Sequence, residues 1–305
     1  MKWKKLGHVF RQDGLVSWRV NSALTPTPFL LNEDTIRVYA GFRDKQGVSR
    51  IGYVDLDSSN PLVITNISQQ PVLDIGRDGC FDDNGVILGD IIRHENSLLM
   101  YYVGFQLVKK AKFLAFTGLA KSIDNGETFI RVSETPVLDR VHGASTIRAI
   151  HSVIYDEGIW KIWYAVGDDW QYINDVAYPR YNIWYTESTS GLFFNKPGVL
   201  CVDVINDEYR IGRPSVYRKN GQYYMFYTKG STTGLDYFPG LAISNDGINW
   251  ERTDSDFGLS LSPGEFDSIH LCYPRLVEVR DKTYGFYNGN NMGTDGFGAA
   301  ELLEW

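Results

Sequence analysis

Four carboxylates stand a short distance ahead of apolar, strand-like segments: the adjacent pair Asp82 and Asp83 in CFDDNG, Glu208 in NDEYR, and Asp267 in GEFDS. Two carboxylates with different pKa values can act as general acid and general base, the chemistry that cleaves a glycosidic bond. Asp82 and Asp83 are the first choice for the acid, because adjacent carboxylates diverge in pKa when only one faces a pocket or an arginine. Asp267, and after it Glu208, is the choice for the second carboxylate. The non-catalytic alternative for the pair is an Asx turn ahead of Gly85.

Cations form a second set. Arg148 and His151 lie in TIRAIHS, and Arg210 and Arg213 lie in YRIGRPS. An arginine fork suits a phosphate or the carboxylate of a sugar acid. Alternatively, the arginines pair with acidic residues to hold neighbouring units together, and His151 is a packed core histidine. The remaining residues predicted to contact a substrate are Arg19, Asn21, His270, Tyr273 and Arg275.

Aromatic side chains with exposed faces could stack on sugar rings. The candidates are Trp18, Trp170, Tyr172, Tyr178 and Tyr181, although most aromatics of the chain lie in strand-like segments and are expected in the core. The long segment 168–181 is predicted to be a functional or rim loop. The Gly-rich segment 289–298 is interpreted as a loop and not as a phosphate cradle. The five histidines show no metal-ligand spacing, so neither a metal nor a cofactor is predicted.

A repeat positions these residues. Five 14-residue stretches, each an apolar strand, a polar turn and an aromatic strand ending in Tyr, align without gaps. They begin at Pro26, Gly89, His151, Pro214 and Pro274. Three of the units continue with a strand, a serine and a turn, and the matching serines are Ser122, Ser188 and Ser244. Each unit therefore supplies about four strands, the content of one propeller blade.

The repeat predicts an all-β, five-bladed β-propeller that occupies residues 1–305 as a single domain. The last unit is short, and the N-terminal segment 3–10 is expected to supply its missing strand and close the ring. The innermost strands of a propeller surround a central channel, so the segments leading into them line one mouth. Seven residues before each repeat start stand Arg19, Asp82, Ala144, Asp207 and Asp267, which predicts a polar pocket at that level.

Composition limits the partners. The net charge of −7 argues against a nucleic-acid partner, and no segment approaches the length of a membrane span. The three cysteines are widely spaced and the N-terminal segment lacks an apolar leader, so a cytoplasmic location is expected. The oligomeric state is left open.

The sequence resembles the five-bladed propeller superfamily that contains glycoside hydrolase families 32, 43, 62 and 130. The resemblance spans the whole chain and is carried by the repeated strand–turn–YYMFY hairpin, the SNDGINW turn and the first-unit stretch YAGFRDKQGVSRIGYVD. The ensemble of DDNGV, RAIHSV, YRIGRPSVY, FDSIHLCYP and FYNGN is most similar to uncharacterised glycosidase-like propellers of bacterial polysaccharide gene sets.

The resemblance also shows departures. Family 43 enzymes place acids where this chain has Thr25 and Ala149, so their mechanism does not carry over. Family 130 enzymes combine an acid in the second blade with basic phosphate-binding residues in later blades, a pattern that Asp82, Asp83 and the arginines echo.

Together these features predict a glycoside hydrolase-like enzyme that cleaves a glycosidic bond of a carbohydrate, and the Arg/His set suits a carbohydrate that carries phosphate or carboxylate. One alternative is a family 130-like phosphorylase, or a transferase or other modifier of activated sugars. The other is a non-catalytic carbohydrate-binding propeller.

Overall fold

The computed structural model describes residues 1–194, 198–233 and 237–305. Twenty strands and two single-turn helices make up its regular structure, which confirms the all-β class. Antiparallel pairing sorts the strands into five groups of four, in chain order. The first is β2 (Asn21–Asn32), β3 (Thr35–Arg43), β4 (Ser49–Asp57) and β5 (Ile64–Ile67). The second is β6 (Val86–His94), β7 (Ser97–Gln106), β8 (Leu114–Ser122) and β9 (Ile130–Arg131).

The third and fourth groups follow the same antiparallel order. The third is β10 (Ile147–Asp156), β11 (Ile159–Ile173), β12 (Val176–Ser188) and β13 (Val199–Val202). The fourth is β14 (Glu208–Lys219), β15 (Gln222–Ser231), β16 (Phe238–Ser244) and β17 (Glu251–Arg252), followed by the 3₁₀ turn η1 (Asp254–Phe257).

The fifth group joins the two ends of the chain. It consists of β18 (Cys272–Val279), β19 (Lys282–Asn288), β20 (Phe297–Glu304) and β1 (Lys2–Phe10), with the single-turn helix α1 (Asn290–Gly293) between β19 and β20. The N-terminal segment thus pairs with the last strand of the chain, as the shortness of the fifth repeat predicted. Parallel pairing of β8 with β10 and of β12 with β14 joins the three middle groups into one twelve-stranded sheet, and each of the three sheets has an open strand order.

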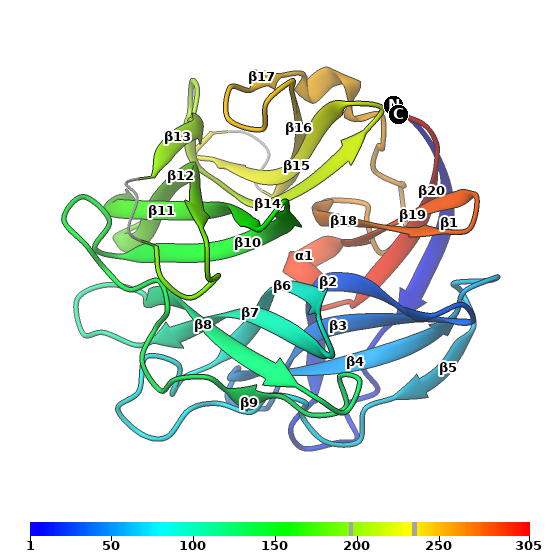
Figure 1. Ribbon diagram of the computed structural model, residues 1–305, viewed down its shortest axis with the longest axis horizontal. Coiled ribbons are helices and arrows are strands. Elements are labelled where there is room, and N and C mark those ends of the chain that lie inside the picture. Colours follow the sequence, from blue (N-terminus) through cyan, green and yellow to red (C-terminus); the bar gives the residue numbers. More distant parts are fainter. Residues whose placement is uncertain (195–197, 234–236) are drawn as a thin grey trace.

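The first strands of the five groups lie closest to the centre of the molecule (Figure 1). There β2 contacts β6, β6 contacts β10, β10 contacts β14, β14 contacts β18, and β18 contacts β2. The groups pack on each other through their apolar faces. Five buried hydrophobic clusters each combine side chains of two neighbouring groups, such as Tyr39 with Met100 and Trp163 with Met225. Aromatic and β-branched side chains suit such pleated, face-to-face contacts.

The repeated serine turns also connect neighbouring groups. Ser122, Ser188 and Ser244 each accept a hydrogen bond from the amide of a glycine three or four residues later, at 2.8–2.9 Å. The carbonyls of the same glycines accept hydrogen bonds from aromatic side chains of the preceding group, Tyr39, Tyr101 and Trp163. The serine and glycine therefore recur because this contact between groups recurs.

Segment 168–181 differs from its prediction. It is not a loop, since β11 runs to Ile173 and β12 begins at Val176, forming one long hairpin. The alternation of its side chains is interrupted by a register shift between Val166 and Asp169, which hides the strand pattern in the sequence. Among the described residues, no helix has the length and hydropathy needed to cross a lipid bilayer.

Candidate functional site

A cavity of about 410 Å³ lies where the five groups meet, and it receives side chains from all of them. Its size is that of a small-molecule pocket. The described residues that line it are Leu24, Thr25, Arg43, Gly47, Ser49, Asn84, Gly85, Ile87, Val103, Phe105, Leu107, Lys112, Phe113, Ala115, Ile147, Ala149, His151, Ala165, Tyr178, Pro179, Tyr181, Arg210, Arg213, Tyr237, Tyr273 and Met292. None of these residues is an Asp or a Glu, whereas five of them are Arg, Lys or His.

A β-bulge at the same point of every inner strand aims residues at this cavity. The register of each inner strand shifts between residues 24 and 27, 88 and 90, 150 and 152, 212 and 215, or 272 and 275. Four of the bulges contribute a cavity residue, namely Thr25, His151, Arg213 and Tyr273. Bulges that re-aim a side chain are common beside active sites.

Three of these bulge residues have strained backbones. The φ angles of Thr25, Arg213 and Tyr273 are 54°, 56° and 58°, and each residue precedes a proline. The left-handed region costs a residue with a side chain of order 1–3 kcal/mol, and the surrounding structure must hold it there. The fifth bulge contains Gly89, where a Cβ atom would collide with the carbonyls of Tyr101 and Ile150.

Arg213 is the most unusual charge in the cavity. Its Nη1 donates to the Leu88 carbonyl and lies 3.2 Å from Nδ1 of His151, and its Nη2 is buried with no hydrogen-bond partner. No described carboxylate forms an ion pair with it. Burial, reinforced by the nearby positive charge of Arg275, lowers the pKa of Arg213 to about 9. The site therefore holds a desolvated guanidinium that lacks an anionic partner.

His151 is neutral in this arrangement. Burial, together with the charges of Arg213 and Arg275, holds the pKa of His151 well below 6.5. Because Nδ1 faces the Arg213 donor at 3.2 Å, we assign it as the acceptor, which leaves the ring proton on Nε2. A neutral imidazole in that tautomer orients the guanidinium without adding charge.

In contrast to Arg213, Arg275 has a carboxylate as its partner. Its Nη1 donates to Oδ1 of Asp90 at 2.7 Å, and its Nη2 donates to the carbonyls of Gly89 and His151. The other carboxylate oxygen of Asp90 accepts from the Val153 amide at 2.7 Å. Burial raises the pKa of Asp90, and the Arg275 charge opposes that shift. This buried pair joins β18, β6 and β10, and Arg275, predicted as a substrate contact, is not among the described residues that line the cavity.

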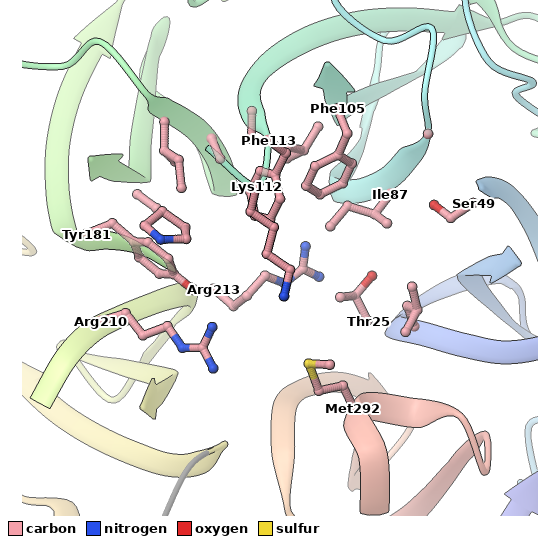
Figure 2. Close-up of a pocket in the computed structure, with 18 of the residues that line it drawn as sticks. Thr25, Ser49, Ile87, Phe105, Lys112, Phe113, Tyr181, Arg210, Arg213 and Met292 are labelled. Atoms are coloured by element: carbon pink, nitrogen blue, oxygen red, sulfur yellow. The ribbon is translucent and has the colours of Figure 1, made fainter. Parts of the chain in front are cut away.

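Three long cationic side chains converge on the cavity. Figure 2 shows Lys112, Arg210 and Arg213 reaching into the same space, Lys112 from the segment before β8 and both arginines from β14. The Arg210 guanidinium lies 4.3 Å from the ring centroid of Tyr237, and the Lys112 ammonium lies 4.4 Å from that of Tyr178. Cation–π contacts of this kind hold a cation in place over a ring.

The four carboxylates predicted as catalytic do not line the cavity. Asp82 is fully buried, and its Oδ2 accepts from Arg131 Nε at 2.7 Å and from the Tyr102 hydroxyl at 3.1 Å. Asp267 is buried in the same way by Lys5 and the Tyr287 hydroxyl.

The remaining two carboxylates also have other partners. Asp83 accepts from the Gly79 amide at 3.0 Å. Glu208 forms a two-pronged ion pair with Arg252, with both distances 2.8 Å.

A repeated packing motif explains why acids recur at the lead-in position. Phe81 stacks on Tyr102 and Phe266 stacks on Tyr287, with ring centroids 5.9 and 5.7 Å apart. In both groups the Asp that follows the Phe meets the hydroxyl of the same Tyr. Recurrence through the repeat therefore reports packing between strands, and it led the sequence prediction away from the cavity.

Of the nine residues predicted as substrate contacts, the cavity includes His151, Arg210, Arg213 and Tyr273. The others lie elsewhere. Arg19 donates to Gln12, and Asn21 accepts from the Ser22 hydroxyl. Arg148 donates to the Asp139 carbonyl, and His270 accepts from the Asn291 amide. Of the predicted stacking residues, Tyr178 and Tyr181 line the cavity, whereas Trp18 packs on Phe42. Trp170 and Tyr172 belong to the part of the β11–β12 hairpin that does not reach the cavity.

Sequence reasoning missed Arg43, Lys112, Phe105, Phe113 and Tyr237. These residues stand at strand ends or in loops, outside the lead-in position that the repeat allowed us to compare. For the bulge position a signal existed, since Thr25, Arg213 and Tyr273 all directly precede the proline that opens a repeat. Within the described part of the chain, no three His, Cys, Asp or Glu side chains gather in a way that could hold a metal ion.

The chain is similar in sequence and in fold to known proteins. No family model matches the sequence. Two curated proteins of Mycobacterium tuberculosis, the uncharacterized proteins MT1551 (strain CDC 1551 / Oshkosh) and Rv1502 (strain H37Rv), are each 32% identical over 303 residues, covering 99% of both chains.

Solved structures share the fold. A glycoside hydrolase superposes with a TM-score of 0.74 at 17% identity, covering 99% of this chain and 93% of the other. A thermostable family-43 glycoside hydrolase gives 0.71 at 17% identity, with 96% and 93% covered. A structure from the GH130 family of mannoside phosphorylases, which contains glycoside hydrolases that target β-1,2-mannosidic linkages in Candida mannan, gives 0.71 at 15% identity, with 98% and 93% covered. The chain therefore has the fold of the propeller glycosidase-like superfamily.

Proposed function

We propose that this protein binds an anionic carbohydrate in its central cavity. The chain belongs to the same family as the Mycobacterium tuberculosis proteins MT1551 and Rv1502. In this proposal the five strand groups are the blades of a single five-bladed propeller domain, residues 1–305. The ligand is a sugar that carries a phosphate or a carboxylate.

The observation that carries the proposal is the state of Arg213. A buried guanidinium without an anionic partner is costly, and a bound anion removes that cost. Arg213 Nη2 is a buried donor with no partner, and Lys112 and Arg210 reach into the same space. Hydrogen bonds between a guanidinium and an anion are among the strongest in proteins.

The aromatic residues of the cavity supply the sugar-binding part. Tyr178, Tyr181, Tyr237 and Tyr273 lie partly buried around the cations, and a sugar ring can pack its C–H face against such rings.

Hydrolysis by a pair of carboxylates receives no support from the described lining. That mechanism requires two carboxyl groups flanking one bond, and Asp82, Asp83, Glu208 and Asp267 all lie outside the cavity. We therefore propose recognition of the anionic sugar as the basic activity and place no catalytic step on these four residues.

Isothermal titration calorimetry tests the proposal with glucose, glucose 1-phosphate, glucose 6-phosphate and glucuronate. At least one anionic sugar should bind measurably while glucose does not. Arg213→Met should weaken that binding about 30-fold, because a hydrogen-bonded charge pair contributes about 2 kcal/mol. The matched control is Arg218→Met, an exposed arginine of the same strand, which should change nothing.

Two results would overturn the proposal. One is equal affinity for glucose and the anionic sugars; the other is an Arg213→Met variant that binds as the wild type does. Product analysis on an oligosaccharide panel, with and without inorganic phosphate, adds a second readout. Cleavage that proceeds without phosphate would restore the paired-carboxylate hypothesis in place of this one.

A further inference from the structure

A sixth hydrophobic cluster also joins two neighbouring groups, but all of its members line the cavity. Its buried members are Val103, Ala115, Ile147, Ala149 and Ala165, and its partly buried members are Ile87, Phe105, Phe113 and Tyr181. All nine residues line the cavity. We call this set the apolar wall; its free face is the cavity itself.

Small and aromatic residues together form the apolar wall. Ala149 and Ala165 lie opposite each other in the β10–β11 register, and Ala115 lies opposite Phe105 in the β7–β8 register. Phe105 and Phe113 stand edge to face above them, with centroids 5.1 Å apart and planes at 87°. The three alanines and the two rings all line the cavity.

The apolar wall cannot satisfy sugar hydroxyls. Apart from the Tyr181 hydroxyl, its nine side chains are hydrocarbon. A hydroxyl buried against such a surface without a hydrogen-bond partner costs about 1–3 kcal/mol. A bare sugar, which carries hydroxyls around its ring, therefore fits this side of the cavity poorly, whereas an apolar substituent gains about 25 cal/mol for each Å² it buries.

The apolar wall and Arg213 are neighbours in the cavity. Arg213 Nη1 donates to the carbonyl of Leu88, the residue directly after Ile87 of the wall. Figure 2 shows Phe105, Phe113 and Ile87 lining the same cavity as Arg213. One small ligand can thus reach both features.

We propose that the ligand is an anionic sugar that carries an apolar substituent, an acyl or aryl group, close to its charged group. This inference rests on the proposed function and specifies its ligand. The anion binds Arg213, and the apolar substituent packs on Phe105 and Phe113.

Pairs of small probes separate the two features. Phenyl phosphate is compared with glycerol 3-phosphate, and benzoate with glycerate, so that each pair holds the anion constant and exchanges an aryl group for a polyol. The aryl member of the phosphate or the carboxylate pair should bind at least about tenfold more tightly by calorimetry. The aryl member that binds more tightly of the two identifies the anion as phosphate or carboxylate. Benzyl alcohol, which is uncharged, should not bind.

Variants assign the difference to the residues. Phe105→Ala should reduce the aryl preference to about threefold or less and leave the affinity for inorganic phosphate within about twofold. Phe193→Ala, at an exposed phenylalanine outside the cavity, is the matched control.

The two proposals fail in different ways. Equal binding of the aryl and polyol members, with an unchanged response to Arg213→Met, overturns the apolar substituent and keeps the anion site. Binding of benzyl alcohol as tight as that of phenyl phosphate, or no binding of any anion, overturns the proposed function and this inference with it.

Discussion

Two regions of the molecule bury charge in opposite ways. At the lead-ins to β6 and β18, Asp82 and Asp267 are fully buried carboxylates, and each has a cation and a tyrosine hydroxyl as partners. In the cavity, Arg213 is a partly buried cation with no described carboxylate as partner, and its Nη2 is buried without a hydrogen bond. In the first region each carboxylate has an opposite charge as partner, although Asp82 Oδ1 and Asp267 Oδ1 are buried without a hydrogen bond. In the second region the proposed anion would supply the missing opposite charge.

The comparison also distinguishes the positions that hold the fold together from the positions that line the cavity. The Phe–Asp pair and its tyrosine occur in two groups because the same strand packing occurs twice. The bulge residues differ from group to group: Thr25, Gly89, His151, Arg213 and Tyr273. In this fold, a position where the structure repeats and the residue type changes is the better pointer to a binding site.

The largest expected effect concerns the lead-in region. Asp82→Ala should lower the free energy of unfolding by about 3 kcal/mol, because it leaves Arg131 and the Tyr102 hydroxyl without their buried partner. Urea denaturation measures this loss. The neighbouring Asp83→Ala removes a single hydrogen bond and should cost about 1 kcal/mol or less. Loss of anion binding in a folded Asp82→Ala protein would contradict the division between the two regions.

The next effect concerns pH. Only the protonated guanidinium binds an anion, and the pKa of Arg213 in the free protein is about 9. Affinity for glucose 1-phosphate should therefore be constant from pH 7 to 8 and fall about tenfold per pH unit well above 9. The ligand keeps its full charge over this range, since a phosphate monoester has its second pKa at about 6. A flat profile up to pH 10.5 would contradict the lowered pKa of Arg213, and the Arg213→Met variant would then test its part in binding.

A smaller effect is expected at His151, which we regard as a positioning residue for Arg213. His151→Ala should weaken anion binding about fivefold, equivalent to about 1 kcal/mol, because Arg213 loses the acceptor at 3.2 Å. His151→Asn retains an acceptor and should recover most of the affinity. A purely space-filling role would instead leave the alanine and asparagine variants equally impaired.

The smallest effect is expected at Lys112, which is exposed and lies over the Tyr178 ring. Lys112→Ala should weaken binding by about 0.5 kcal/mol and flatten its dependence on salt, since an exposed cation acts mainly through screened attraction. Titrations at low and high ionic strength measure this. A loss larger than that caused by Arg213→Met would reverse the order of the two cations.

Much of the fold could be predicted because the sequence repeats at a regular interval. The 14-residue hairpins correspond to the first two strands of each group, and the short fifth repeat indicated that residues 3–10 pair with the end of the chain. Segment 168–181 was missed because a bulge breaks its alternation. A sequence repeat describes the packing that all units share. It gives no information where one unit departs from that packing.

The site was only partly predictable for the same reason. Of the predicted residues, His151, Arg210, Arg213 and Tyr273 line the cavity, and all four lie close to a repeat start. The four predicted carboxylates lie outside this lining, because the direction of a side chain depends on the bulge and a one-residue slip in a strand turns a side chain to the other face. Lys112, Phe105 and Phe113 approach the cavity through loops and strand ends whose course the repeat does not describe.

The pairing of β1 with β20 has a consequence for biosynthesis. The ribosome makes Lys2–Phe10 before the other four groups and its partner strand, Phe297–Glu304, after them. The other four groups can assemble as they leave the ribosome, because their strands are consecutive in the chain. The fifth group has to wait until the four groups between its strands have been made, so β1 lacks its partner strand during that time.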